Sequence, residues 1–146
     1  GAFPVFNMEA VEDGEISRYY GMPVYGVPGF KLGKYHHRRQ KVDPDAMDRA
    51  CHPEDEAVLR TAIRHYFPKA NGPTMAMKTC LFTNSPDEHF VLDAHPEFPQ
   101  VSIAAGFSGH GFAIGPVVGR LLGEWLVDGR PSLDLSAFRA DRFETA

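Results

Sequence analysis

The chain has 146 residues, a net charge of −4 and 43% hydrophobic residues, so it is long enough to bury a core and is not a disordered polymer. Its acidic balance argues against general nucleic-acid binding, and no apolar run approaches the ~20 residues of a membrane span. Because the first residues also lack the pattern of a signal peptide, we expect a cytoplasmic protein that binds neither nucleic acid nor membranes.

The first part of the chain is rich in aromatic and β-branched residues that Gly and Pro interrupt. Residues 3–8, 16–26 and 29–36 each predict a short strand. The connections between them are too short for helical crossovers, so the pattern predicts an antiparallel set.

Two Asp/His-Pro pairs, Asp43-Pro44 and His52-Pro53, each predict a helix start, because Pro suits the first helical position and acidic residues follow. The second pair begins a helix predicted over about residues 53–66. Its apolar stripe is expected to consist of Ala57, Leu59, Ile63 and Tyr66.

The following segment predicts a β-hairpin over residues 75–94. Its strands are 75–83 and 89–94, on either side of a turn at residues 84–87. The apolar run 101–105 then predicts a strand buried on both faces, as in a parallel sheet.

A glycine-rich loop over residues 106–112 joins this strand to a helix predicted over residues 116–127. Pro116 is expected near its first turn, and Gly129 is expected to end it. A strand that runs into such a loop and a helix N-terminus suits an anion or the edge of a cofactor. The glycines match neither a G-x-G-x-x-G unit nor a P-loop, so a tight turn that needs positive φ explains them equally well.

Four other residues could carry chemistry. A lone Cys80 on a strand is by itself best explained as a small buried hydrophobe. Lys31, His36 and His37 lie together, but adjacent histidines point to opposite faces of a strand and no metal-ligand spacing occurs, so we expect no metal site.

The acidic and histidine residues at 87–89 suit turn chemistry better than an acid–base site. A hydrolase built on Ser108 and His110 would lack the G-x-S-x-G spacing of a nucleophile elbow.

Three segments together resemble one family. Residues 20–33, 80–90 and 103–112, in this order, are similar to the C-terminal part of the monomeric sarcosine oxidase and N-methyltryptophan oxidase family, whose members are FAD-dependent amine oxidoreductases of the D-amino-acid-oxidase superfamily. The resemblance extends over residues 16–143. It implies oxidation of the C–N bond of a secondary or N-methyl amino acid to an imine, with O₂ reduced to H₂O₂.

The resemblance also implies residue roles. Cys80 corresponds to the cysteine that holds FAD through a thioether, and Lys31 to a lysine beside the flavin that is linked to oxygen activation. An active-site histidine corresponds to His36 or His37, because one additional residue between Lys31 and Gln40 leaves both open.

Other roles follow from the same resemblance. Tyr20 corresponds to a substrate-site aromatic residue. Phe82 and Ala113 replace a tyrosine and a substrate-pairing lysine of relatives, so simple sarcosine is a doubtful substrate. The segment that lies against the flavin ring corresponds to Gly109, His110, Gly111 and Phe112.

The family's FAD-binding Rossmann unit, which carries the G-x-G-x-x-G motif, has no counterpart in this sequence. We therefore expect an α+β C-terminal fragment of a two-domain α/β flavoprotein. Residues 1–97 would supply antiparallel strands of the substrate domain. Residues 98–146 would supply the last strand–loop–helix of a Rossmann-like FAD-binding domain.

In isolation, such a fragment is expected to lack FAD and activity, and to self-associate. Its partners would be an amine substrate, O₂ and the missing N-terminal Rossmann portion. The alternative is a stand-alone, non-catalytic domain that binds a ligand or partner through the loop 106–112.

Overall fold

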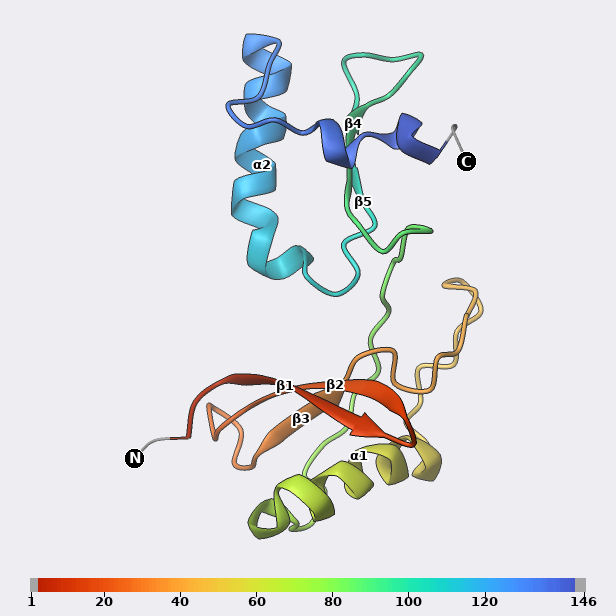
Figure 1. Ribbon diagram of the computed structural model, residues 1–146, viewed down its shortest axis with the longest axis vertical. Helices are drawn as coiled ribbons and strands as arrows, with labels where there is room; N and C mark the ends of the chain where they lie inside the picture. The colour runs from red at the N-terminus through yellow and green to blue at the C-terminus, as the bar shows by residue number, and fades with distance from the viewer. Residues whose placement is uncertain (1–2, 144–146) are drawn as a thin grey trace. The chain divides into compact units, whose positions relative to one another are not determined.

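The computed structural model describes residues 3–143 (Figure 1). The chain divides into two compact units between Cys80 and Leu81, and each unit has its own strands and helices. None of the helices within the described part combines the length and apolar character that a membrane span requires. The fold is a mixed α/β arrangement with antiparallel sheets.

The first unit contains a three-stranded antiparallel sheet in the order β1-β2-β3, which confirms the predicted antiparallel set. Its strands are β1 (Phe6–Glu12), β2 (Glu15–Met22) and β3 (Lys31–Lys34). Strand β1 lies further along the chain than the predicted 3–8. The reason is the turn at Asp13 and Gly14, where both residues have positive φ, so that pairing starts next to it and runs back to Phe6.

Helix α1 (Pro53–Tyr66) has the predicted bounds, and the backbone N–H of His52 donates to Asp55 Oδ2 at 2.9 Å. It packs on the sheet, with the ring of Tyr66 6.4 Å from that of the buried Tyr19 (Figure 1). A single 3₁₀ turn, η1 (Pro68–Ala70), follows it.

Two expectations about this region are wrong. Ala57 is exposed, and Ala62, which was not in the predicted stripe, is the buried residue of α1. No helix starts at Pro44 within the described chain: residues 44–46 form only a turn, in which the carboxylate of Asp43 accepts the N–H of Asp45.

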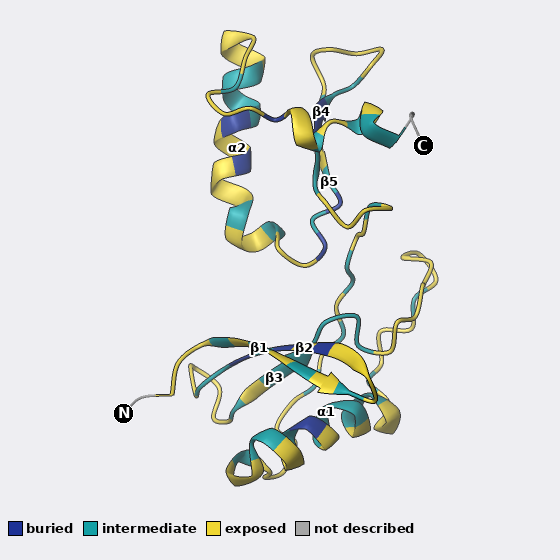
Figure 2. Ribbon diagram, in the orientation of Figure 1, coloured by how far each residue is buried: buried dark blue, intermediate teal, exposed yellow. Residues whose placement is uncertain are grey.

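The second unit is built from a two-stranded antiparallel hairpin, β4 (Val91–Ala94) and β5 (Ser102–Ala105), and helix α2 (Gly111–Asp128). Two 3₁₀ turns follow, η2 (Ser136–Phe138) and η3 (Ala140–Phe143). Figure 2 shows buried positions on α2 and at β4. The core of this unit consists of Leu92, Val118, Leu121 and Leu135.

The predicted hairpin over 75–94 is wrong. Residues 75–83 form no strand, and β4 pairs with β5, because the N–H of His95 donates to the carbonyl of Val101 at 2.8 Å and closes a short connection between them. The same pairing shows that β5 lies in an antiparallel hairpin and not in a parallel sheet. The expected boundary at residues 97 and 98 falls inside this connection, and the assignment of the two parts to a substrate and an FAD-binding domain stays a prediction.

Helix α2 begins at Gly111, earlier than predicted, so Pro116 lies inside the helix. Its end is as predicted. Gly129 adopts the left-handed conformation with φ +74°, and its N–H donates to the carbonyl of Trp125 at 3.0 Å.

Candidate functional site

The first unit brings an aromatic ring and a cation together on neighbouring strands. Tyr20 of β2 lies directly opposite Gly33 of β3, and a Cβ at Gly33 would overlap its ring. Lys31, at the start of β3, holds its Nζ 5.9 Å from the Tyr20 ring centroid. The ring of Tyr35 meets Tyr20 edge-on at 5.1 Å.

Sequence reasoning missed Gly33 and Tyr35 as parts of this cluster. A glycine inside a strand does signal a close approach to another group, so Gly33 could have been found from its position in β3. The sequence around Tyr35 has no comparable indication of a contact, because Tyr35 lies beside the Tyr20 ring only once β2 pairs with β3.

Cys80 belongs to the surroundings of the same tyrosine. Burial raises the pKa of Tyr20, and the nearby Cys80 and Tyr35 raise it further. Tyr20 therefore stays protonated at neutral pH. The interpretation of Cys80 as a small buried core residue is wrong, since Cys80 is exposed. Three of the predicted site residues, Tyr20, Lys31 and Cys80, thus lie near one another.

The two candidate histidines have different surroundings. His37 Nε2 lies 3.2 Å from Asp55 Oδ1, in the first turn of α1, and Arg38 Nη1 lies 3.5 Å from the same oxygen. The backbone N–H of His52, followed by His37 and Arg38, holds the pKa of Asp55 below its ordinary value. His37 is thereby tied to the start of α1. His36 has a left-handed backbone with φ +51°.

In the second unit, the loop 106–112 has a specific backbone conformation. Gly106, Ser108 and Gly109 all have positive φ, at +66°, +46° and +85°. Ser108 is buried, and its N–H donates to the carbonyl of Thr83 at 3.1 Å. A Cβ at Gly109 would lie 2.8–3.2 Å from ring atoms of Phe82, so the predicted residues Phe82 and Gly109 are in contact.

The loop ends at the N-terminus of α2. His110 precedes the helix, and its carbonyl accepts the N–H of Ala113 at 3.1 Å. The N–H groups of Gly111 and Phe112 begin the helix and have no acceptor inside it. Phe112 is fully exposed, and His110 and Ala113 are exposed as well. N–H donors at a helix N-terminus, together with the helix dipole, can stabilise an anion.

The alternative chemistries have less support. Asp87 accepts the N–H of His89 and binds Arg142, which agrees with turn chemistry at residues 87–89. Ser108 Oγ donates to the carbonyl of Gly106 at 3.3 Å, inside its own loop. Over residues 3–143, no three His, Cys, Asp or Glu side chains are placed to hold a metal ion.

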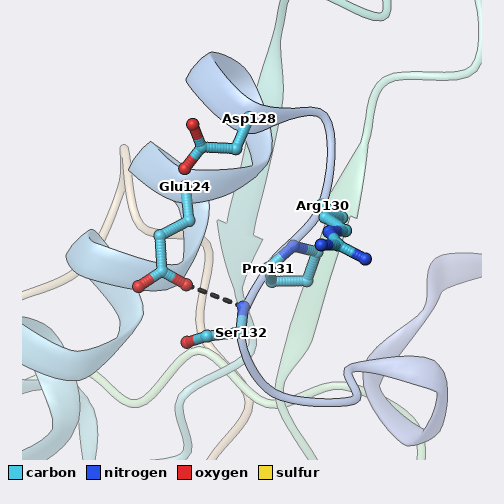
Figure 3. A pocket seen from close by; sticks show the side chains of 5 residues that line it. All are labelled: Glu124, Asp128, Arg130, Pro131 and Ser132. Carbon is cyan, nitrogen blue, oxygen red and sulfur yellow. Dashed lines mark hydrogen bonds between the residues drawn. The ribbon is translucent and has the colours of Figure 1, made fainter.

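A separate pocket lies at the other end of α2 (Figure 3). There Glu124 Oε2 accepts the backbone N–H of Ser132 at 2.7 Å. None of the predicted site residues lines this pocket. Its lining consists of Glu124, Asp128, Arg130, Pro131 and Ser132.

Comparison with known proteins places these features in a family context. A family model described as FAD dependent oxidoreductase matches residues 3–125. The chain is 45% identical over 142 residues to a monomeric sarcosine oxidase of Bacillus sp. (strain NS-129), covering 96% of this chain and 35% of that protein. It is 46% identical to that of Arthrobacter sp. (strain TE1826), with the same coverage.

A third relative is the N-methyl-L-tryptophan oxidase of Yersinia pestis (strain Pestoides F), which is 32% identical over 143 residues, or 97% of this chain and 37% of that protein. The chain therefore spans about a third of the length of the curated relatives it matches.

Proposed function

The chain belongs to the FAD-dependent oxidoreductase family, and we propose that it is the C-terminal part of an enzyme that oxidises the C–N bond of a secondary or N-methyl amino acid. The observation that carries this proposal is the cluster of Tyr20, Lys31 and Cys80, in which a residue from the end of the first unit lies near two residues of neighbouring strands. The family match extends over both units, which favours this function over a stand-alone binding domain.

We propose that Cys80 holds the cofactor. An exposed cysteine is accessible to an electrophilic methyl group, and a thioether at the flavin 8α-methyl would anchor FAD covalently. Bound FAD would supply the redox chemistry, which takes a hydride equivalent from the amine and passes two electrons to O₂ to give H₂O₂. In the second unit, considered by itself, the N–H groups of Gly111 and Phe112 at the start of α2 would stabilise negative charge on a flavin.

Lys31 and Tyr20 would act on the reactants. The ammonium group of Lys31 favours the negative charge that develops on O₂ as it is reduced. The hydroxyl of Tyr20 is protonated at neutral pH even at the ordinary tyrosine pKa of about 10, and burial raises that pKa further, so it can donate a hydrogen bond to the substrate. The active-site histidine is proposed to be His36 or His37, and the contact of His37 Nε2 with Asp55 Oδ1 at 3.2 Å ties His37 to the start of α1.

The substrate is proposed to differ from simple sarcosine. Ala113 is exposed in the first turn of α2 and offers no cation for a substrate carboxylate. Phe82 presents a ring to Gly109 and carries no hydroxyl. Both features favour a larger or more apolar N-methyl amino acid.

The cofactor role of Cys80 can be tested in the flavin-containing enzyme. Acid precipitation should leave a yellow pellet for the unmodified protein, because a thioether survives denaturation. Cys80→Ala should lose this colour. Cys51→Ala, which removes the chain's other cysteine, is the matched control and should retain it. Acid-stable flavin in the Cys80→Ala protein would overturn the assignment.

A further inference from the structure

The tail that follows α2, residues 129–143, packs against the structure that supports the loop 106–112. The family match ends at residue 125, yet the described chain continues through the 3₁₀ turns η2 and η3. Leu135 is 6% exposed and belongs to the core of the second unit. The N–H of Ala140 donates to the buried carboxylate of Asp93 at 2.9 Å. This tail is therefore an integral part of the unit.

Arg142 contacts the turn 85–89 through its guanidinium group. Its Nε donates to Asp87 Oδ2 at 2.8 Å, and its Nη2 donates to Asp87 Oδ1 at 3.1 Å. The same Nη2 donates to the carbonyl of His89 at 3.1 Å, and Nη1 donates to the carbonyl of Arg139 at 2.8 Å. The guanidinium thus makes a two-pronged ion pair and also joins two backbone segments.

The turn in its own right supports the loop. Ser85 Oγ lies within hydrogen-bond distance of both Asp87 Oδ1 and the carbonyl of His89, which share its single proton. A Cβ at Gly106 would lie 3.3 Å from Ser85 Cβ and 3.4 Å from the His89 carbonyl, so the turn and the loop are in close contact. Two residues before Ser85, the carbonyl of Thr83 accepts the N–H of Ser108.

Aromatic side chains make a second connection between tail and loop. The ring of Phe138 stacks on Phe90 with centroids 5.7 Å apart and planes 21° apart. Phe90 in turn contacts Phe107, at 5.5 Å, and His110, at 6.5 Å. Through the ring of Phe90, the tail therefore reaches Phe107 and His110 of the loop.

We propose that Arg142 is a positioning residue, which fixes the conformation of the loop 106–112 by clamping the turn 85–89 against it. Arg142 acts through Asp87 and the His89 carbonyl. The flavin role of the loop rests on the function proposed above. The clamp itself does not depend on that function.

Amide hydrogen exchange in this chain tests the clamp. The reporter is the N–H of Ser108, which bonds across to Thr83, and the references are the amides of the buried Leu121 in α2 and its neighbour Leu122. Arg142→Gln removes the ion pair. Arg142→Lys keeps the positive charge but loses the planar guanidinium that contacts both oxygens of Asp87. Arg139→Gln is the matched control, because Arg139 pairs with Asp141 in the same tail.

We expect Arg142→Gln to raise exchange at Ser108 by about fivefold while the α2 amides stay within about twofold of the unmodified protein. Arg142→Lys should recover part of the protection, and Arg139→Gln should change nothing at Ser108. Equal acceleration of loop and helix amides would show only global destabilisation and would overturn the proposal, as would unchanged exchange at Ser108. If Arg142→Gln does not fold, Asp87→Asn makes the same test from the other side of the pair.

Absorption spectra of the flavin-containing enzyme separate this proposal from the function on which it builds. Selective acceleration at Ser108 together with an altered flavin spectrum would support both. Faster amide exchange at Ser108 alone, with an unchanged flavin absorption spectrum, would support the positioning role of Arg142 and contradict the flavin role of the loop.

Discussion

Gly109 should be the least replaceable residue of the loop, for two separate reasons. Its φ of +85° lies in the left-handed region, which costs a residue with a Cβ about 1 kcal/mol. In addition, a Cβ there would lie 2.8–3.2 Å from the ring of Phe82, and such overpacking costs about 1–3 kcal/mol. Gly109→Ala should therefore lower the free energy of unfolding of the second unit by about 2–4 kcal/mol.

The chain offers a control for the first of these terms. Gly129 has a similar φ of +74°, but a Cβ there would meet nothing within 4 Å. Gly129→Ala should thus lose only about 1 kcal/mol. The difference between the two variants isolates the contact with Phe82.

Urea denaturation followed by tryptophan fluorescence measures both variants, because the only tryptophan, Trp125, lies in α2 and reports on this unit. Adding Phe82→Ala closes a double-mutant cycle. In that background Gly109→Ala should lose no more than Gly129→Ala does. If Gly109→Ala and Gly129→Ala are equally destabilised in the presence of Phe82, the proposed steric role of Gly109 is refuted.

Three further results are expected. Ala113→Lys should raise kcat/KM for sarcosine by about tenfold in the flavin-containing enzyme, because a cation returns near the carboxylate, and an unchanged value would contradict the assigned position of Ala113. Arg142 holds the pKa of the Asp87 carboxyl below its ordinary value of about 3.9, so the ion pair stabilises the fold fully above that pH and stops doing so as pH falls through the folded-state pKa. Urea midpoints measured from pH 5 downward should therefore fall less steeply for Asp87→Asn than for the unmodified protein. Equal slopes for the two proteins would argue against the ion pair. Gly119→Ala should stabilise α2 by about 0.5–1 kcal/mol, because a Cβ there meets no described atom within 4 Å, and a lower urea midpoint would exclude this.

The sequence by itself was sufficient wherever the signal was local. His52-Pro53 and the acidic residues after it specify the start of α1, and Gly129 specifies the end of α2, because capping involves only neighbouring residues. The start of α2 was missed, since Gly111 and Phe112 are weak helix formers and no polar cap of the preferred kind precedes them.

Contacts between distant residues were decided only in the tertiary structure. The pairing of β4 with β5 depends on hydrogen bonds that an apolar pattern does not encode. The exposure of Cys80 depends on residues 75–83 forming no strand, and its proximity to Tyr20 depends on where the chain places both. The clamp between Arg142 and Asp87 joins segments far apart in the chain. Local propensity acts over a few residues, whereas the surroundings of a site residue are set by whichever distant segment packs against it.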